Sequence, residues 1–424
     1  MAKNDTRDSR DYEPRPRLRT ALARGLLLFA ALVLCSIAAE GLLRALRPDL
    51  LNIPSQHRVP HPHYGWALRA GGEYVHQVDT DSVRVVINHQ GWHDQERKVA
   101  KTTGTLRIAV LGDSFVEGYS VNADQAFPHG LEARLRNPPI RSANGSSLPV
   151  EVLSFGVGGY GTLQELLVYR DEIRRYQPDL VLLGFCVAND VRNNSRELES
   201  VLDGSPLEMS GRPYLVFDAT TERWRLAGPE QDRRTDQVPS SRRILGSARR
   251  SVLVKGLLRL IAAFTGPTTE QNELAVHGVH FCNEPPEYEW AWRVTGELLR
   301  RLRDEVAADG ARLVVFSEPT YRETADSARR RVEARSSDPG QLCLDEAPGF
   351  TRLGDLLATL GIPYVDLLSE FRRQEPSNTL FRRADHHWNR AGNQLVAAAL
   401  AREARERLWL VGNSRVPGPL EPAP

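Results

Sequence analysis

The stretch IAVLGDSFVEG, residues 108–118, decides the fold class of this chain. An apolar run that reads as a buried strand ends in a small residue, an acid and a serine, Ser114. Open α/β sheets place their chemistry at the carboxyl ends of their strands, so Ser114 stands where such a sheet carries a nucleophile. An ordinary strand-to-helix turn is the other interpretation, and three later segments bear on the choice.

A second segment, residues 150–162 (VEVLSFGVGGYGT), runs from a strand into a glycine-rich turn. Glycines permit a sharp turn and leave backbone N–H groups free to face an anion. Gly156, Gly158 and Gly161 also fit the G-x-G-x-x-G pattern of dinucleotide-binding folds. That pattern belongs on the first strand of its fold. Because a strand already precedes it here, a dinucleotide site is the weaker alternative.

Two more segments combine strand or helix patterns with polar residues. Residues 178–190 read as a strand that is buried on both faces and ends in Asn189. In isolation, this asparagine is a helix or loop cap. Residues 384–389 (ADHHWN) precede a helical pattern over residues 390–408, for which Asn389 is the natural N-cap.

The acid and histidines of the last segment suggest a catalytic pair. In an extended stretch, side chains two residues apart point the same way, so we expect Asp385 and His387 to share one side and His386 to face the other. A carboxylate beside an imidazole holds one tautomer and stabilises the protonated ring. A metal site and loop histidines without a role are the alternatives, although the sequence offers no matching ligand cluster and no zinc-type cysteine spacing.

Together the four segments resemble the SGNH (GDSL-type) hydrolase superfamily over about residues 106–408. The resemblance implies a serine-dependent acyl-transfer enzyme without a cofactor or a metal. Ser114 would be its nucleophile, His387 its base, and Asp385 the acid that orients the base.

The resemblance also implies an oxyanion hole. Its donors would be the backbone N–H of Ser114, the N–H of a glycine in the second segment and the side-chain amide of Asn189. For the glycine, Gly156 and Gly158 compete with Gly159, which we choose from its place at the end of the turn.

The sequence departs from the usual family pattern in several places. In these places it resembles the membrane-anchored bacterial branch of the superfamily, which includes alginate-acetyltransferase-like proteins. Many family esterases read Asp-x-x-His, whereas residues 385–388 read Asp-x-His-Trp. The third segment has Val-Ala-Asn-Asp at 187–190, where Gly-x-Asn-Asp is commoner. Residues 64–66 (YGW) and 88–94 (NHQGWHD) resemble the lead-in of anchored members, in which Arg commonly stands at the position of His93.

The composition bounds the class of protein. A chain of 424 residues with 41% hydrophobic and 26% charged residues is globular, and its net charge of +1 gives no case for nucleic-acid binding. Of the four cysteines, Cys282 and Cys343 could pair in an oxidising compartment, but nothing in their spacing requires it.

Residues 25–43 are apolar except for Glu40, which is the length needed to span a bilayer. Lys and Arg are concentrated before this segment, so the positive-inside rule predicts a cytoplasmic tail over residues 1–24, a transmembrane signal anchor over 25–43 and export of the rest. We expect the tail to be disordered. Cleavage near residues 36–38 (SIA), as in a signal peptide, is the alternative.

The remaining pattern predicts an α/β fold, with a doubly wound parallel sheet of about five strands flanked by helices. We place the strands near residues 107–111, 150–155, 180–186, 312–317 and 363–366, and the helices near 126–136, 162–176, 288–309 and 390–408. Residues 44–105 form an accessory β segment, 106–412 the SGNH domain, and 413–424 a Pro-rich tail.

An insertion over about residues 195–286 interrupts the SGNH domain. It contains a hairpin formed by residues 214–217 and 223–226, a loop at 231–243 and a helix at 251–264. We expect disorder over residues 325–339. The aromatic residues within 288–292 read first as core packing and second as a sugar-stacking platform.

The expected function is hydrolysis of acyl esters outside the cytoplasm, on O-acylated envelope glycans or related esters. The partners would be that substrate, the inner membrane through the N-terminal helix, and envelope polysaccharide machinery. A polysaccharide O-acetyltransferase would use the same Ser114, His387 and Asp385, and is the first alternative. A non-catalytic glycan-binding or assembly subunit is the second.

Overall fold

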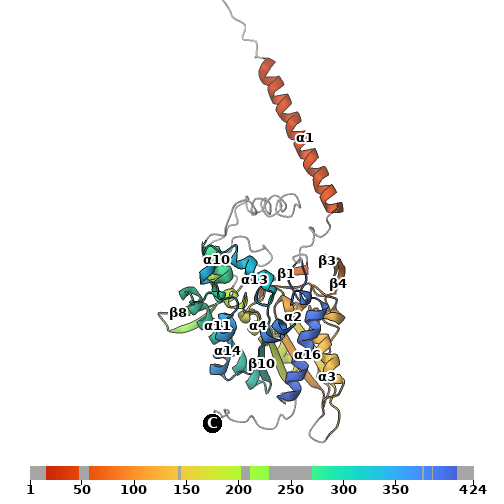
Figure 1. Ribbon diagram of the computed structural model, residues 1–424. Coiled ribbons are helices and arrows are strands. Elements are labelled where there is room, and N and C mark those ends of the chain that lie inside the picture. Colours follow the sequence, from red (N-terminus) through yellow and green to blue (C-terminus); the bar gives the residue numbers. More distant parts are fainter. Residues whose placement is uncertain are drawn as a thin grey trace, which may run out of the picture. The chain divides into compact units, whose positions relative to one another are not determined.

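The computed structural model describes residues 16–46, 57–141, 145–201, 211–228, 270–374, 377–383 and 385–407 (Figure 1). The chain forms two compact units, Met1–Leu51 with Ser240–Thr265, and Asn52–Pro239 with Gly266–Pro424. The predicted 231–243 loop, 251–264 helix and 413–424 tail lie outside the described residues.

The described part of the first unit is helix α1 (Pro16–Leu46). It begins before the expected start at Gly25, so the expectation of a disordered tail is wrong for residues 16–24. Large aliphatic side chains along α1 are exposed, including Leu27, Leu28 and Leu34. In the part of the chain that the structure describes, no helix has the length and apolar character needed to cross a membrane.

The second unit is built on a five-stranded sheet in which every pairing is parallel. Its order is β11-β10-β7-β5-β6. The strands are β5 (Leu106–Gly112), β6 (Val150–Gly156), β7 (Leu180–Phe185), β10 (Arg312–Ser317) and β11 (Tyr364–Val365). Helices cover both faces, so the predicted α/β fold class with a five-stranded parallel sheet is confirmed.

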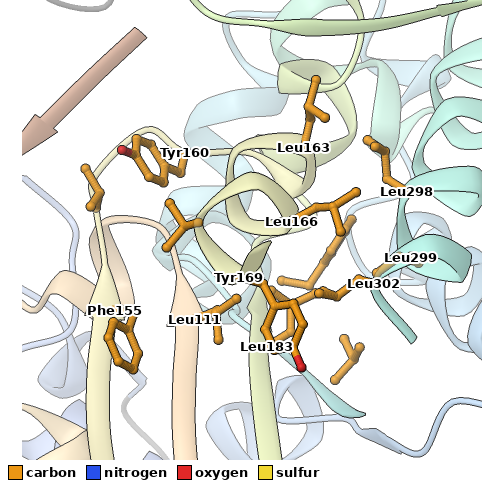
Figure 2. Packing of buried hydrophobic residues seen from close by; sticks show 14 of the residues in the cluster. Leu111, Phe155, Tyr160, Leu163, Leu166, Tyr169, Leu183, Leu298, Leu299 and Leu302 are labelled. Atoms are coloured by element: carbon orange, nitrogen blue, oxygen red, sulfur yellow. The ribbon is translucent and has the colours of Figure 1, made fainter. Parts of the chain in front are cut away.

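Strand side chains alternate between two separate cores, as the two-residue period of a strand requires. On one face, Leu111, Phe155 and Leu183 pack against the helices α4 (Thr162–Val168) and α11 (Pro286–Ala308) (Figure 2). Helix α14 (Pro348–Leu360) contributes Leu353 and Leu357 to the same core. The chain after α4 continues as a π-helical turn (Tyr169–Ile173) and a 3-10 turn (Arg174–Tyr176), so the helix predicted over 162–176 changes its winding part-way.

The other face buries Ile108, Val110 and Val152 against Leu131 and Leu400. Its helices are α2 (Ser114–Glu117), α3 (Phe127–Arg136), α15 (Leu368–Arg373) and α16 (Arg390–Glu406), and α3 packs against α16 (Figure 1). Short helices and turns complete the described chain: η3 (Ala123–Gln125), α5 (Asp190–Asn193), α6 (Arg196–Val201), α10 (Glu270–His277), η7 (Gly278–His280), α12 (Tyr321–Thr324), η8 (Pro339–Gln341) and η9 (Ser377–Leu380).

The strand order creates a switch point between β5 and β7. From β5 the chain moves to β6 on one side and then returns to β7 on the other. Connections therefore leave the carboxyl ends of β5 and β7 in opposite directions, and open α/β sheets bind ligands in the crevice that results.

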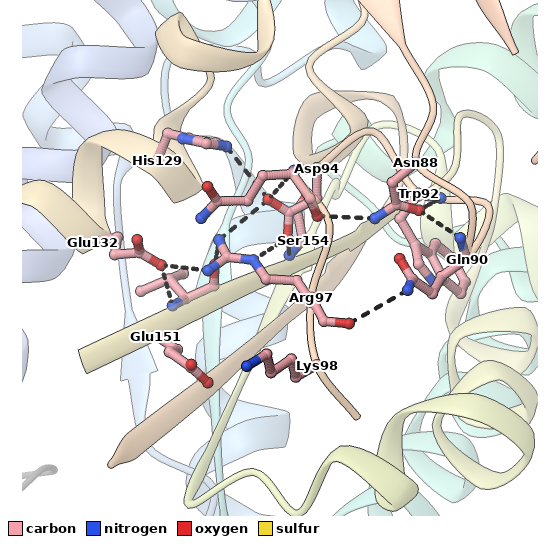
Figure 3. Close-up of polar contacts among 12 residues, drawn as sticks. Asn88, Gln90, Trp92, Asp94, Arg97, Lys98, His129, Glu132, Glu151 and Ser154 are labelled. Atoms are coloured by element: carbon pink, nitrogen blue, oxygen red, sulfur yellow. Dashed lines mark hydrogen bonds and ion pairs between the residues drawn. The ribbon is translucent and has the colours of Figure 1, made fainter. Parts of the chain in front are cut away.

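Two small antiparallel pairs precede the sheet, β1 (Arg58–His61) with β2 (Gly65–Leu68) and β3 (Glu73–Val78) with β4 (Asp81–Val86). The turn that follows them is tied to the core by buried charges (Figure 3). Arg97 bonds Asp94 at 2.9 Å and Glu132 of α3 at 2.9 Å. Glu132 also accepts the Val152 N–H of β6. Because such groups are costly to bury unpaired, this network keeps the accessory segment on the sheet.

The described part of the insertion contains the predicted hairpin, with β8 (Tyr214–Asp218) antiparallel to β9 (Arg223–Ala227). The expectation of disorder over 325–339 is wrong, because helix α13 (Asp326–Glu333) occupies much of this segment. Ala328 is buried, and Arg329 pairs with Asp345 at 2.7 Å. Tertiary contacts thus order a stretch whose polar composition resembles a loop.

Candidate active site

The hydroxyl of Ser114 lies at the carboxyl end of β5, in the first residue of α2. Asp113 caps this helix, and its Oδ1 accepts the Phe115 N–H at 2.8 Å. Such a cap satisfies one of the N–H groups that have no acceptor within a helix. The N–H of Ser114 is another of these groups, so the helix start offers a backbone donor beside the hydroxyl.

His387 reaches Ser114 from the loop before α16. Its Nε2 lies 2.7 Å from Ser114 Oγ, across 273 positions of sequence. The next residue, Trp388, is buried and donates from Nε1 to the Pro319 carbonyl at 3.0 Å. Asn389 caps α16 by accepting the Ala391 and Gly392 N–H groups, as predicted. The loop is therefore held on both sides of the imidazole.

Asp385 lies on the far side of His387, with Oδ2 3.7 Å from Nδ1. Its Oδ1 accepts the backbone N–H of His387 at 3.1 Å. His386 has φ 61°, a left-handed conformation that few residues other than glycine adopt. Asp385 and His387 therefore lie together as predicted, but a turn at His386 brings them together and not an extended strand. His386 stacks instead on Tyr321, with ring centroids 4.9 Å apart.

Tyr119 is a site residue that the sequence analysis missed. Its hydroxyl lies 3.1 Å from His387 Nδ1, closer than Asp385 does, and its ring meets the imidazole edge-on. Gly118, in the left-handed region at φ 64°, ends α2 and turns the chain so that the next residue faces back to the site. No motif marks this tyrosine, and only its position shortly after Ser114 hints at it.

The electrostatic surroundings favour a protonated His387. Burial lowers its pKa, but the close contact with Asp385 and the charge of that carboxylate act in the opposite direction. The charges of Asp113 and Glu117 also raise it, and the result is a pKa above the ordinary 6.5. For Asp385, burial raises the pKa, and the contacts with His387 outweigh it and leave that pKa below 3.8. An imidazolium formed during the reaction is therefore stabilised.

The glycine-rich turn after β6 commits most of its backbone donors. Two of these N–H groups bond to backbone carbonyls: Val157 N–H to Gly112 O, and Tyr160 N–H to Val157 O. Two bond to side chains: Gly158 N–H to Glu117 Oε2, and Gly161 N–H to Gln164 Oε1. Among the residues that the structure describes, the Gly159 N–H has no such acceptor. The N–H of the competing Gly158 already donates to Glu117 and is not free to bind an oxyanion. These hydrogen bonds favour Gly159 as the oxyanion donor.

Side chains from outside the four segments fix the peptide of Gly159. Trp66 Nε1 donates to the Gly158 carbonyl at 3.3 Å, on the same peptide group as the Gly159 N–H. In a trans peptide these two groups point in opposite directions, so the N–H faces away from Trp66. Arg212 Nη2 donates to the Gly159 carbonyl at 2.7 Å. The resemblance at residues 64–66 had singled out Trp66, whereas no pattern in the sequence marked Arg212.

Asn189 follows β7 and occupies the N-cap position of α5, but its side chain makes no capping bond. Its Nδ2 donates instead to Asp113 Oδ2 at 2.9 Å. The amide is thereby held beside the serine turn at the switch point. The alternative in which Asn189 is only a cap does not fit this geometry.

The turn glycines are explained by close packing. A Cβ on Gly156 would lie 2.1 Å from Glu117 N, and one on Gly158 would lie 2.3 Å from Arg58 Nη2. A Cβ on Gly161 would lie 2.8 Å from Asn193 Cβ. Protein atoms therefore fill the places where a dinucleotide phosphate would approach, which disfavours that alternative.

Within the described ranges, one group of side chains has the geometry of metal ligands, Asp113, Cys186 and Glu318, all buried. The two histidines of the ADHHWN segment are not part of it. Burial, followed by the charge of Asp113, raises the pKa of Glu318 well above its ordinary value. Asp113 is also the residue whose Oδ2 accepts the Asn189 amide.

Two other predictions concern residues away from the serine. The structure pairs Cys282 with Cys343 in a disulfide. Tyr288 and Trp292 are buried in the core, whereas Trp290 is partly buried and stacks on Trp224. The core interpretation therefore holds for the first two aromatics.

Part of the chain matches a known protein family. Residues 284–416 match a family described as "SGNH hydrolase-like domain, acetyltransferase AlgX". A comparison with the curated proteins gave no match.

Three solved structures are similar to the chain. The lipase/acylhydrolase from Enterococcus faecalis is 14% identical, with a TM-score of 0.38 and coverage of 72% of this chain and 97% of that one. The acetyl xylan esterase AlAXEase is 10% identical, with a TM-score of 0.35 and coverage of 70% and 98%. A mutant of Axe2, an acetyl-xylooligosaccharide esterase from Geobacillus, is 12% identical, with a TM-score of 0.36 and coverage of 72% and 96%.

Proposed function

We propose, from the premise that the chain is an SGNH-type esterase or acyltransferase, that it is a serine-dependent acyl ester hydrolase. In this proposal it acts outside the cytoplasm, on O-acylated envelope glycans or related esters. One observation carries the proposal: Ser114 Oγ lies 2.7 Å from His387 Nε2 at the switch point of the sheet. A nucleophile within hydrogen-bond reach of a base that a third group orients is the general arrangement for covalent acyl transfer.

The geometry supports a two-step reaction. His387 Nε2 takes the Ser114 proton while Oγ forms a bond to the ester carbonyl carbon. The Ser114 N–H, the Gly159 N–H and the Asn189 amide would stabilise the oxyanion. When the intermediate collapses, the alcohol leaves with the proton from His387. Water then attacks the acyl carbon while His387 takes its proton. The acid leaves as the bond to Ser114 Oγ breaks, and His387 returns the proton to Oγ.

A polysaccharide O-acetyltransferase remains the second candidate, because the matched family is described as an acetyltransferase. In that reaction a sugar hydroxyl takes the place of water and receives the acyl group from Ser114. The same three groups serve both reactions, so the acceptor alone separates them. A non-catalytic subunit is less favoured, since nothing in glycan binding requires a serine and a histidine at 2.7 Å.

The location and the membrane anchor are part of the proposal. Lys and Arg are concentrated before residues 25–43, and these residues are apolar apart from Glu40. The disulfide between Cys282 and Cys343 supports export, because such bonds persist in oxidising compartments.

An assay on the purified protein with p-nitrophenyl acetate, butyrate and octanoate, with and without an acetylatable oligosaccharide, tests the activity. Hydrolysis in the absence of the oligosaccharide is the expected result. Transfer to the oligosaccharide, with little hydrolysis, would favour the acetyltransferase. Equal rates for the protein and its Ser114→Ala variant would contradict both.

A further inference from the structure

The oxygen nearest to His387 Nδ1 among its described partners is not a carboxylate. The Tyr119 hydroxyl lies at 3.1 Å, and Asp385 Oδ2 at 3.7 Å, which is beyond hydrogen-bond length. Asp385 is still held close, because it accepts the backbone N–H of His387. Asp385 therefore lies beside His387, but the Tyr119 hydroxyl is nearer than Asp385 to the Nδ1 atom.

We propose that the Tyr119 hydroxyl links Asp385 to His387 as a positioning group, accepting the Nδ1–H and donating its own proton to the carboxylate. The inference rests on the proposed acyl-transfer function and adds a fourth residue to the group of Ser114, His387 and Asp385. The order of the chain is then Asp385, Tyr119, His387 and Ser114.

The tautomer required for catalysis sets the direction of these bonds. To take the Ser114 proton, His387 must present a bare Nε2 and carry its hydrogen on Nδ1. Tyr119 must then accept at 3.1 Å, and its single proton is left for a second acceptor. If the tyrosine donated to Nδ1 instead, Nε2 would carry the hydrogen and could not act as a base.

Asp385 is the acceptor that fits this second bond. Burial, followed by the charges of Asp385 and Glu117 and a hydrogen bond to Asp385, raises the pKa of Tyr119 well above its ordinary value. The same contact helps to lower the pKa of Asp385. The hydroxyl therefore keeps its proton, and the carboxylate stays charged.

The ring of Tyr119 provides a reason for this exact placement of the hydroxyl. It packs edge-on against the imidazole, with centroids 4.9 Å apart. Phe115 lies against another side of the imidazole, with centroids 4.8 Å apart. A phenylalanine at position 119 would keep the ring contact and remove only the hydroxyl, which makes the substitution a clean test.

The other ionisable groups that interact with His387 are unchanged by the Tyr119→Phe substitution. Asp113 and Glu117 come from the α2 turn, and their charges raise the pKa of His387. His386 lies on the same loop and interacts with it electrostatically. Since none of these groups changes in Tyr119→Phe, a shift in the pH profile reports the lost hydroxyl.

The experiment measures the rate of fluorophosphonate labelling and of p-nitrophenyl acetate hydrolysis against pH, for the full chain and Tyr119→Phe. We expect kcat to fall about 10- to 100-fold with little change in KM, as for a lost contribution to general-base catalysis. The limb that reports His387 should move to lower pH, because the imidazolium loses an acceptor. Tyr169→Phe is the matched control: it also removes a hydroxyl bonded to a carboxylate, that of Asp309 at 2.8 Å, away from the site.

A double-mutant cycle separates a link through Tyr119 from a direct action of Asp385. Asp385→Ala should be costly in the natural chain but lower the rate less than about threefold further in the Tyr119→Phe background, because residues that act as a unit are not additive. An equal cost of Asp385→Ala in both backgrounds, or an unchanged rate and pH profile in Tyr119→Phe, would overturn the link and leave the acyl-transfer function standing.

A measurement on the natural chain keeps the proposal testable if Tyr119→Phe does not fold. In the ¹⁵N NMR spectrum of histidine-labelled protein at high pH, His387 should carry its hydrogen on Nδ1. A hydrogen on Nε2 would overturn the proposal. Failure of the acyl-transfer function itself has a different signature, since the natural chain and Ser114→Ala would then label equally.

Discussion

Glu117 Oε2 accepts the Gly158 N–H at 2.5 Å and so joins the helix that begins at Ser114 to the glycine turn after β6. In the proposed reaction the two pieces supply different donors to the oxyanion hole, and this bond ties them together. Burial raises the pKa of Glu117, while the charge of Arg58 and the Gly158 N–H oppose the rise.

The first prediction concerns this bond. Glu117→Ala leaves the buried Gly158 N–H without an acceptor, which costs about 1–3 kcal/mol of unfolding free energy. We expect kcat to fall about 10-fold or more because the adjacent donor moves. Glu117→Gln keeps an acceptor oxygen and should lose less of both. Urea unfolding and steady-state kinetics of the two variants check this, and equal losses would show that the charge is what counts.

The second prediction separates the two histidines. His387→Ala and Ser114→Ala should each abolish fluorophosphonate labelling, because they remove the base and the nucleophile. His386→Ala should keep substantial labelling, since this ring is exposed and stacks on Tyr321. Labelling that survives in His387→Ala but is lost in His386→Ala would reverse the assignment.

The third prediction concerns the Asn189 amide, which we propose as an oxyanion donor. Asn189→Ala should lower kcat by about 100-fold or more, as for loss of a transition-state donor. The melting temperature should change little, because the side chain makes no capping bond. A large drop in melting temperature with kcat nearly intact would mean that the bond to Asp113 is structural.

The fourth prediction follows from the raised pKa of His387. The base must be neutral to accept a proton, so kcat/KM should rise with pH through a midpoint above 6.5. The stability linked to this group has the opposite sign: it is fully present below the unfolded pKa and is lost as pH rises through the folded one. The unfolding free energy of the natural chain relative to His387→Ala should therefore shrink from pH 6 to pH 9. A midpoint below 6.5 would contradict the prediction.

The fifth prediction tests topology. Alkaline phosphatase fused after Asp49 should be active and should sediment with the membrane. Active soluble phosphatase with a new N-terminus near Ala39 would replace the anchor by a cleaved signal peptide and keep export. An inactive fusion would contradict export as well.

Much of the fold followed from local patterns. Strands buried on both faces read as continuous apolar runs, so the positions of β5, β6 and β7 were predictable from the local sequence pattern. The β8–β9 hairpin and the Asn389 cap were also predictable, because each depends on residues close in sequence. Helix α13 was not, since its order comes from tertiary contacts such as that between Arg329 and Asp345.

The sequence by itself determined which side chains stand at the carboxyl ends of strands, and hence that Ser114 and Asn189 would meet at one edge of the sheet. Tertiary structure alone decided that His387 approaches Ser114 across 273 positions, through a left-handed turn at His386. It also decided that Tyr119 stands nearer to the imidazole than Asp385 does. The physical reason is that periodicity encodes which face a residue occupies, whereas a distance between segments depends on how separate pieces pack, which no local pattern contains.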